Sequence, residues 1–387
     1  MQTVVNLLKA NIRQYGMLVA LLAIMLLFQI LTDGILFKPL NVTNLILQNS
    51  HILVLAIGMM LVIISGHIDL SVGSVAAFVG AVAAILMVEM NVPFAAAIFL
   101  SLLLGALIGA WQGFWVAYVR VPSFIVTLAG MLMFRGLTML VLEGQSIGPF
   151  PDAFRALSSG FIPDIPGGRG IHLLSILIGI LLSLLLIALE WGKRLSDIRY
   201  RFETEPFAYF IAKLVILAAA LNLFIYVLAS YEGIPNILIV LLVLIFLYTF
   251  VANRTVIGRH IYAMGGNEKA AMLSGVKTKR VTFWVFVNMG TLAALSGLVF
   301  AARLNAATPK AGTNFELDAI AACFIGGASM SGGVGTVIGG VIGGLVMGVM
   351  NNGMSILGIG VDWQQAIKGL VLLLAVAFDI YNRSKSS

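Results

Sequence analysis

The strongest constraint on this chain is a succession of apolar stretches, each about as long as a membrane is thick. Three of them, at residues 171–191, 207–230 and 235–252, follow one another with only short polar segments between them. A helix needs about 20 apolar residues to cross the hydrocarbon core of a bilayer. Because 60% of the residues are hydrophobic and only 10% are charged, a soluble core of ordinary proportions cannot hide this surface. The sequence therefore predicts an all-α polytopic membrane protein, with a single transmembrane domain over residues 1–387.

Counting the apolar stretches predicts roughly ten or eleven transmembrane helices. The other expected spans lie at about residues 17–31, 45–64, 75–88, 94–119, 122–142, 281–302, 316–352 and 363–381. Polar residues and glycines interrupt the pattern near 65–74 and 328–336, and we expect broken helices there. Irregular backbone survives at membrane depth only when it is buried in protein or lines a cavity. Leu317–Asp318 loosely echoes Ile68–Asp69, and a break in each half indicates a possible internal duplication.

The distribution of charge predicts the orientation in the membrane. A net charge of +7 suits nucleic acid, but the basic residues fall in short clusters between apolar spans. This is the pattern of cytoplasmic loops, so no nucleic-acid partner is expected. Span counting then places both termini and residues 258–280 in the cytoplasm, on the basis of Lys9, Arg13, Arg383 and Lys385, and makes residues 143–170 an external loop. Cys323 is the only cysteine, which excludes an intramolecular disulfide and suggests no metal site.

The first break, SGHIDLSVGS at residues 65–74, carries an acid. An ionised Asp69 at bilayer depth costs about 2.5–3.5 kcal/mol, so this side chain should cap a helix, face a cavity or lie near an interface. Capping is one interpretation, and Ser71 and Ser74 in the next turn favour it. In the other, compatible interpretation, the broken helix lines a path for a polar solute. The candidate path residues are Asp69, Ser71, Ser74, Asn351 and Asn352, although the asparagines also suit hydrogen bonds between helices.

A strongly polar segment, residues 258–280, separates two of the apolar stretches. Asn267 is a good helix N-cap, Glu268 suits the positive end of a helix, and Gly275 supplies a C-terminal stop. These residues predict a helix of about two turns, which is too short to be stable in water without packing against another surface. The segment is either a connecting loop with a helical turn or a docking element for another protein. The candidate docking residues are Gly265, Gly266, Asn267, Glu268, Ala270, Ala271, Ser274 and Gly275.

No enzymatic motif stands out in the sequence. It contains no HExxH, no GxSxG nucleophile elbow and no GxxxxGK[ST] phosphate loop. We therefore expect no catalytic residues in this chain. If it takes part in ATP-driven transport, the ATPase must be another chain.

Four motifs in order resemble one family. IDLSVGSV at 68–75, PSFIVTLAGM at 122–131, GRHIYAMGGNEKAAMLSGV at 258–276 and LDAIAACFIGG at 317–327 are similar to the permease subunits of bacterial monosaccharide importers of the ATP-binding-cassette class, ribose and xylose type. The extra basic loop and span at 192–230 resemble the xylose or multiple-sugar branch. The likeness spans nearly the whole chain.

The resemblance implies a homodimer in the bacterial inner membrane, a periplasmic sugar-binding protein and a cytoplasmic ATPase that holds the ATP and Mg²⁺, with no cofactor in this chain. It also implies that the candidate docking residues form the coupling helix that seats in the ATPase. The expected function is a transmembrane path for a pentose or hexose. The alternatives are a branched-chain amino-acid permease of the same class, an ion-coupled secondary transporter and an intramembrane enzyme.

Overall fold

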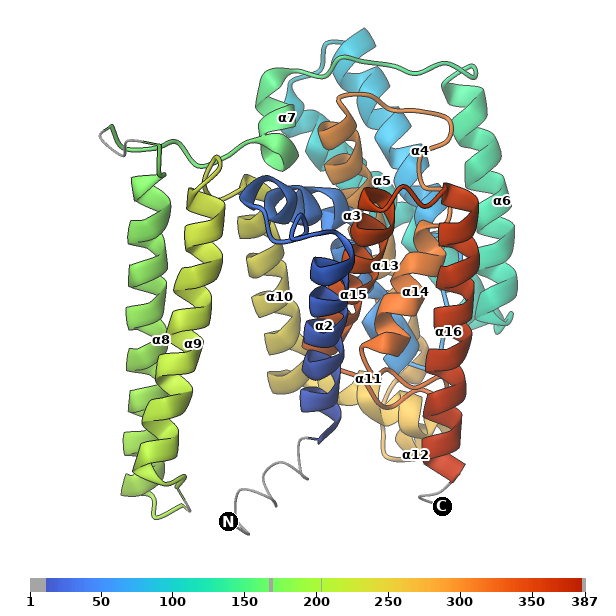
Figure 1. Cartoon of the computed structure of the whole chain (residues 1–387). Helices are drawn as coiled ribbons and strands as arrows, with labels where there is room; N and C mark the ends of the chain where they lie inside the picture. Colours follow the sequence, from blue (N-terminus) through green and yellow to red (C-terminus); the bar gives the residue numbers. More distant parts are fainter. Residues whose placement is uncertain (1–11, 167–169, 203, 385–387) are drawn as a thin grey trace. The chain divides into compact units, whose positions relative to one another are not determined.

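The computed structural model of the chain describes residues 12–166, 170–202 and 204–384, and most of these are folded into helices (Figure 1). The helices are α2 (Ile12–Leu31), α3 (Pro39–Ile64), α4 (Val72–Ala84), α5 (Phe94–Phe114), α6 (Ser123–Val141), α7 (Asp152–Ser159), α8 (Leu173–Arg199), α9 (Phe207–Ala229), α10 (Asn236–Arg254), α11 (Val256–Gly266), α12 (Glu268–Leu273), α13 (Thr278–Leu304), α14 (Phe315–Ile325), α15 (Val337–Ile356) and α16 (Val361–Ser384). The π-helical turns Ile85–Glu89 and Trp115–Val119 extend α4 and α5.

The predicted all-α polytopic fold is confirmed. Within the described residues, nine helices are long and apolar enough to cross a membrane. The apolar part of α2, residues 16–31, is shorter, and α16 is long enough but carries Asp362 and Lys368 in its first half. Lys9 and Lys385, on which the orientation partly depends, lie outside the described residues.

Prolines mark where several of the long helices begin. Pro93, Pro122 and Pro206 are the N-caps of α5, α6 and α9, each with φ near −52°. A proline suits this place because its fixed φ directs the chain into the helix and its missing N–H is not needed there. One boundary differs from expectation, since α8 continues past Trp191 to Arg199. The basic residues expected in a loop therefore lie partly on a helix.

The chain forms two compact units. Unit 1 comprises Met1–Leu36, Leu45–Ser159 and Ile237–Ser387, and unit 2 comprises Phe37–Asn44 and Gly160–Asn236. Unit 2 holds α8 and α9, which are joined by a salt bridge of 3.1 Å between Lys213 and Glu190 and by Arg194, whose guanidinium lies 4.7 Å from the centre of the Phe210 ring. The single permease domain stays a prediction.

Glycines allow the central helices of unit 1 to approach closely. A Cβ atom at Gly109 of α5 would overlap the carbonyl oxygen of Phe286 in α13, and one at Gly290 would overlap that of Gly105. Transmembrane helices associate through such small residues because lipid provides no hydrophobic force between them. The glycines at 105, 109 and 113 therefore form a stripe along which α5 packs against α13.

Helix α15 carries two such stripes, one for each neighbour. Gly339 and Gly343 lie against the backbone of α14, where Cβ atoms would overlap the carbonyl oxygens of Gly326 and Ala322. The stripe at 340, 344 and 348 faces the side chains Met60, Leu53 and Asn49 of α3. Helix α15 is thus held between α14 and α3, and the last two are the helices that end at the two breaks.

Both predicted breaks are present. Helix α3 ends at Ile64 and α4 begins at Val72, whereas α14 ends at Ile325 and α15 begins at Val337. The possible internal duplication stays a prediction. The two acids of the repeated pattern, Asp69 and Asp318, have different surroundings. Asp69 precedes α4, whereas Asp318 lies within the first turn of α14 and pairs with Lys368 at 3.0 Å.

Candidate functional site

The polar segment at residues 258–280, which we call the proposed coupling segment, contains most of α11 and all of α12. The Thr255 hydroxyl oxygen accepts a hydrogen bond from the Gly258 backbone N–H at 3.2 Å, which caps α11. Asn267 Oδ1 accepts one from the Ala270 backbone N–H at 3.0 Å and caps α12, with Glu268 in its first turn. Gly275 has φ +89°, a conformation that favours glycine. The short helix, its cap and its glycine stop were predicted, whereas α11 was not.

The two sides of α12 differ in burial. Ala271 is 5% exposed, whereas Leu273 and Met272 are 85% and 53% exposed. A six-residue helix that presents two bare apolar side chains has a surface suited to a partner. With 3.6 residues per turn, Leu273 lies on the side opposite the buried Ala271, and Met272 lies between them. The coupling roles given to the residues from Gly265 to Gly275 stay predictions.

Helix α11 ends directly against both helix breaks. A Cβ at Gly265 would overlap the carbonyl oxygen of Ile64, the last residue of α3, and would come within 2.6 Å of the Gly333 nitrogen. That nitrogen donates a hydrogen bond to the Ile64 carbonyl at 2.8 Å. The Tyr262 hydroxyl donates to the Gly335 carbonyl at 2.8 Å. We call this meeting of α11, residues 64–66 and residues 332–335 the glycine junction.

Asp69 organises the first break from within. Its Oδ1 accepts hydrogen bonds from the Ser71 backbone N–H at 2.8 Å and from the Ser71 hydroxyl at 2.6 Å. The Ser71 oxygen in turn accepts one from Gln112 Nε2 of α5 at 2.8 Å. All three side chains are at most 2% exposed. Asp69 therefore holds the turn before α4 but does not cap the helix, because Ser71 is the N-cap and no side chain among the described residues makes a capping hydrogen bond there. Gln112 is a member of this cluster that the sequence did not indicate. Ser74 Oγ is buried and has no hydrogen-bond partner among the described residues.

A second polar pair lies beside α4. Glu316, in the first turn of α14, is 6% exposed, and a Cβ at Gly73 would overlap its Oε2. Arg135 lies on α6, which packs against α4. Within the described residues, Glu316 Oε2 and Arg135 Nη2 are both buried without a hydrogen-bond partner. Unsatisfied polar atoms at membrane depth are costly, which makes this pair a candidate for contact with a polar solute.

Asn351 and Asn352 lie far from Asp69 along the direction of the helix axes. Both are near the end of α15, where Gly353 meets the Phe28 ring of α2. One turn earlier, Gly348 packs against Asn49, and about 22 Å of helix separates Asn49 from the end of α3. The structure therefore does not bring the five predicted path residues together. Asp69 and Ser71 form one cluster, and the asparagines lie elsewhere; their path role stays a prediction.

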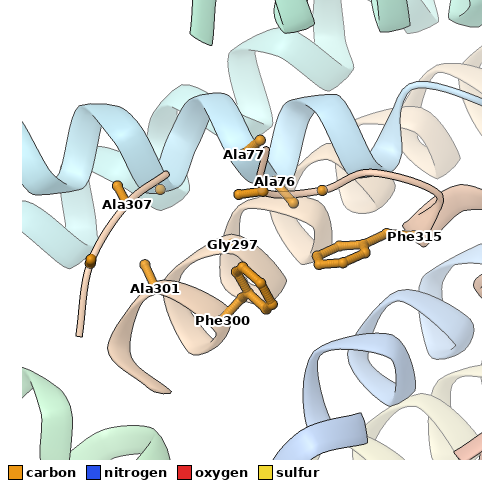
Figure 2. Close-up of a pocket in the computed structure, with 11 residues that line it drawn as sticks. Ala76, Ala77, Gly297, Phe300, Ala301, Ala307 and Phe315 are labelled. Carbon is orange, nitrogen blue, oxygen red and sulfur yellow. The ribbon is translucent and has the colours of Figure 1, made fainter. Parts of the chain in front are cut away.

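A small cavity lies farther along α4 than the Asp69 cluster, between α4, α13 and the loop after α13. Figure 2 shows the rings of Phe300 and Phe315 beside the turn of α4 that carries Ala76. The ring centres are 5.0 Å apart. The cavity volume is about 10 Å³, room for about one water molecule. A monosaccharide does not fit there without separation of these helices.

The family is decided by similarity over most of the chain. A family model described as "Branched-chain amino acid transport system / permease component" matches residues 41–376. The chain belongs to this family of permease components.

The relatives extend the match to almost the full length. The permease is 42% identical to the xylose transport system permease protein XylH of Haemophilus influenzae, over 98% of this chain and 99% of the relative. It is 40% identical to XylH of Escherichia coli, over 97% and 94%. It is also 34% identical to the ribose import permease protein RbsC of Escherichia coli, over 96% and 95%. No solved structure matches the chain.

Proposed function

We propose that this chain is the membrane-spanning permease subunit of an ATP-driven importer of a monosaccharide, with xylose as the first candidate. The observation that carries the proposal is the similarity, over nearly the full length, to permeases of xylose and ribose transport systems. The description of the family names branched-chain amino acids, but these relatives are sugar permeases, so the amino-acid alternative is less favoured. An ion-coupled carrier or an enzyme is not favoured by these relatives either.

The partners follow from the same proposal. Since the sequence has no phosphate loop, ATP and Mg²⁺ bind to a separate ATPase, and a periplasmic binding protein delivers the sugar. A second copy of the permease completes the path. In unit 1, α2 begins and α16 ends at the end where α11 and α12 lie, and α7 lies at the opposite end (Figure 1). This arrangement supports termini on the same side of the membrane as the proposed coupling segment, and the basic clusters make that side the cytoplasm.

The glycine junction suggests how the motion is transmitted. The ATPase engages the exposed side of α12, including Leu273, and displaces α12 together with α11. Because Gly265 touches the end of α3 and the loop before α15 through backbone atoms, both breaks must move with α11. The first break holds Asp69 and Ser71, Gln112 of α5 donates a hydrogen bond to Ser71, and Glu316 of α14 lies against Gly73 at the start of α4. Hydroxyl, amide and carboxylate groups of this kind suit an uncharged sugar rich in hydroxyls.

The test is reconstitution in proteoliposomes with the cognate ATPase and binding protein. Uptake of radiolabelled xylose should require ATP on the ATPase side and both partners, and a non-hydrolysable ATP analogue should stop it. Excess unlabelled leucine should leave the uptake unchanged. Uptake by the permease alone, or uptake that follows an ion gradient without ATP, would contradict the proposal. Transport of leucine in place of xylose would restore the amino-acid alternative.

A further inference from the structure

A large apolar cavity opens on the side of unit 1, outside the region of the two breaks. Its volume is about 410 Å³, and α3, α10, α11 and α13 line it. Most of its lining is aliphatic, with Leu61, Val251, Ile261, Val281 and Val285 among the contributors. A sugar bound there would leave most of its hydroxyls without partners, which is unfavourable. The lining instead suits a hydrocarbon chain.

The polar residues of the cavity lie at its two ends. Arg280, in the first turn of α13, is exposed, and His260 of α11 is half-buried. At the inner end, the Tyr248 hydroxyl donates a hydrogen bond to Asn288 Oδ1, so the two side chains close the cavity. Eight residues of helix, or about 12 Å, separate Arg280 from Asn288. The cavity therefore runs from the end of the membrane helices inward to the depth of the acyl chains.

The charge at the mouth is left for an outside partner. Among the described residues, Arg280 forms no salt bridge. Residues 258–280 contain five Lys or Arg residues and one acid, Glu268. Ile257 and Trp284, which also line the cavity, are 61% and 62% exposed, so the opening is continuous with the apolar outer surface of α13. Tryptophan is enriched at the level of lipid headgroups.

We propose that this cavity is a binding site for an anionic phospholipid. One acyl chain occupies the cavity between α10 and α13, and the phosphate group lies against Arg280, with His260 beside it. Basic pockets between membrane helices on the cytoplasmic side are suited to anionic headgroups, because that leaflet is rich in acidic lipids. The site shares His260, Ile261 and Arg280 with the proposed coupling segment but does not depend on which solute is carried.

The test uses Trp284 as a reporter of the lipid in contact with it. The other four tryptophans, Trp111, Trp115, Trp191 and Trp363, are replaced by Phe, and the full chain is reconstituted in vesicles of phosphatidylcholine and phosphatidylglycerol at 80:20. Bromine on the acyl chains of one lipid or the other quenches tryptophan fluorescence on contact. The two samples contain the same mole fraction of brominated lipid, either phosphatidylglycerol or phosphatidylcholine. Brominated phosphatidylglycerol should quench Trp284 more than brominated phosphatidylcholine does, with a preference of roughly five-fold for one basic contact.

Two matched variants decide whether the cavity is responsible. Arg280→Gln should reduce the preference to about one-fold, whereas Lys279→Gln, which removes the same charge one residue away and outside the lining, should keep it. An equal loss in both variants would point to general surface charge and overturn the site. Equal quenching by the two lipids in the parent protein would also overturn it. If neither brominated lipid quenches Trp284, a protein surface such as a second copy covers the cavity, and the proposal is wrong.

Discussion

Ser71 is the residue on which the first break most depends. Its backbone N–H and hydroxyl both donate to Asp69, and its oxygen accepts the only hydrogen bond that Gln112 Nε2 donates among the described residues. Replacement by alanine leaves two buried polar groups with fewer partners, which costs about 1–3 kcal/mol. Ser71→Ala should therefore lower the thermal stability of the purified protein. Cys323 is fully buried, so a thiol-reactive fluorophore reports unfolding directly.

Ser101 provides the matched control. Its side chain is also fully buried, but its Oγ has no hydrogen-bond partner among the described residues. Ser101→Ala removes an unsatisfied polar atom and should leave the unfolding midpoint unchanged or raise it. Equal losses of stability in the two variants would mean that the hydrogen bonds of Ser71 contribute little. Asp69→Asn should fall between them, because the amide oxygen still accepts.

Single residues were predictable where the signal is local. Asn267 caps the helix that follows it, and Gly275 has the positive φ expected of a stop, since both depend on neighbours in sequence. Gln112 reaches Ser71 across 41 positions, and Glu316 meets Gly73 across a greater separation. Neither has a spacing that a sequence pattern can reveal. A buried acid in an apolar run is the signal that could have drawn attention to Glu316.

The element that transmits motion in the proposal is α11, through Gly265. Adjacent glycines allow a clean comparison, because a Cβ at Gly265 would overlap the Ile64 carbonyl oxygen, whereas a Cβ at Gly266 meets nothing within 4 Å. Gly265→Ala should force α11 away from both breaks and reduce sugar uptake several-fold in the reconstituted importer. Gly266→Ala makes the same change in helix propensity and should transport normally.

Comparison of the transport rate with the ATP hydrolysis rate separates a coupling defect from a loss of folded protein. If Gly265 transmits motion, Gly265→Ala should lower transport more than ATP hydrolysis by the assembled complex, while its yield and gel-filtration profile match those of Gly266→Ala. Equal transport by the two variants would exclude the glycine junction as the coupling contact. Helix α11 itself was not predicted, because glycine disfavours a helix and two glycines end this one; packing against α3 and residues 332–335 overrides that local preference.

At the scale of the whole molecule, apolar length and charge predicted the fold class and the order of the spans, because the bilayer imposes both. The division into two compact units was not foreseen, since Phe37–Asn44 and Gly160–Asn236 join through contacts that no local pattern encodes. The sides of the membrane follow from the basic clusters alone. An independent measurement of orientation is therefore the most informative one for the complete chain.

Two serine-to-cysteine variants measure that orientation. Cys323 is fully buried, and Cys323→Ala removes it as a background thiol. Ser146, in the loop after α6, and Ser274, after α12, are both exposed. In intact cells, a membrane-impermeant maleimide should label Ser146→Cys from outside but should label Ser274→Cys only after the membrane is opened. The positive-inside rule requires this result. Residues 258–280 carry five basic side chains, and the three expected spans at 171–191, 207–230 and 235–252 place residues 143–170 on the opposite side of the membrane. Labelling of Ser274→Cys from outside would invert the permease and place the coupling segment beyond the reach of a cytoplasmic ATPase.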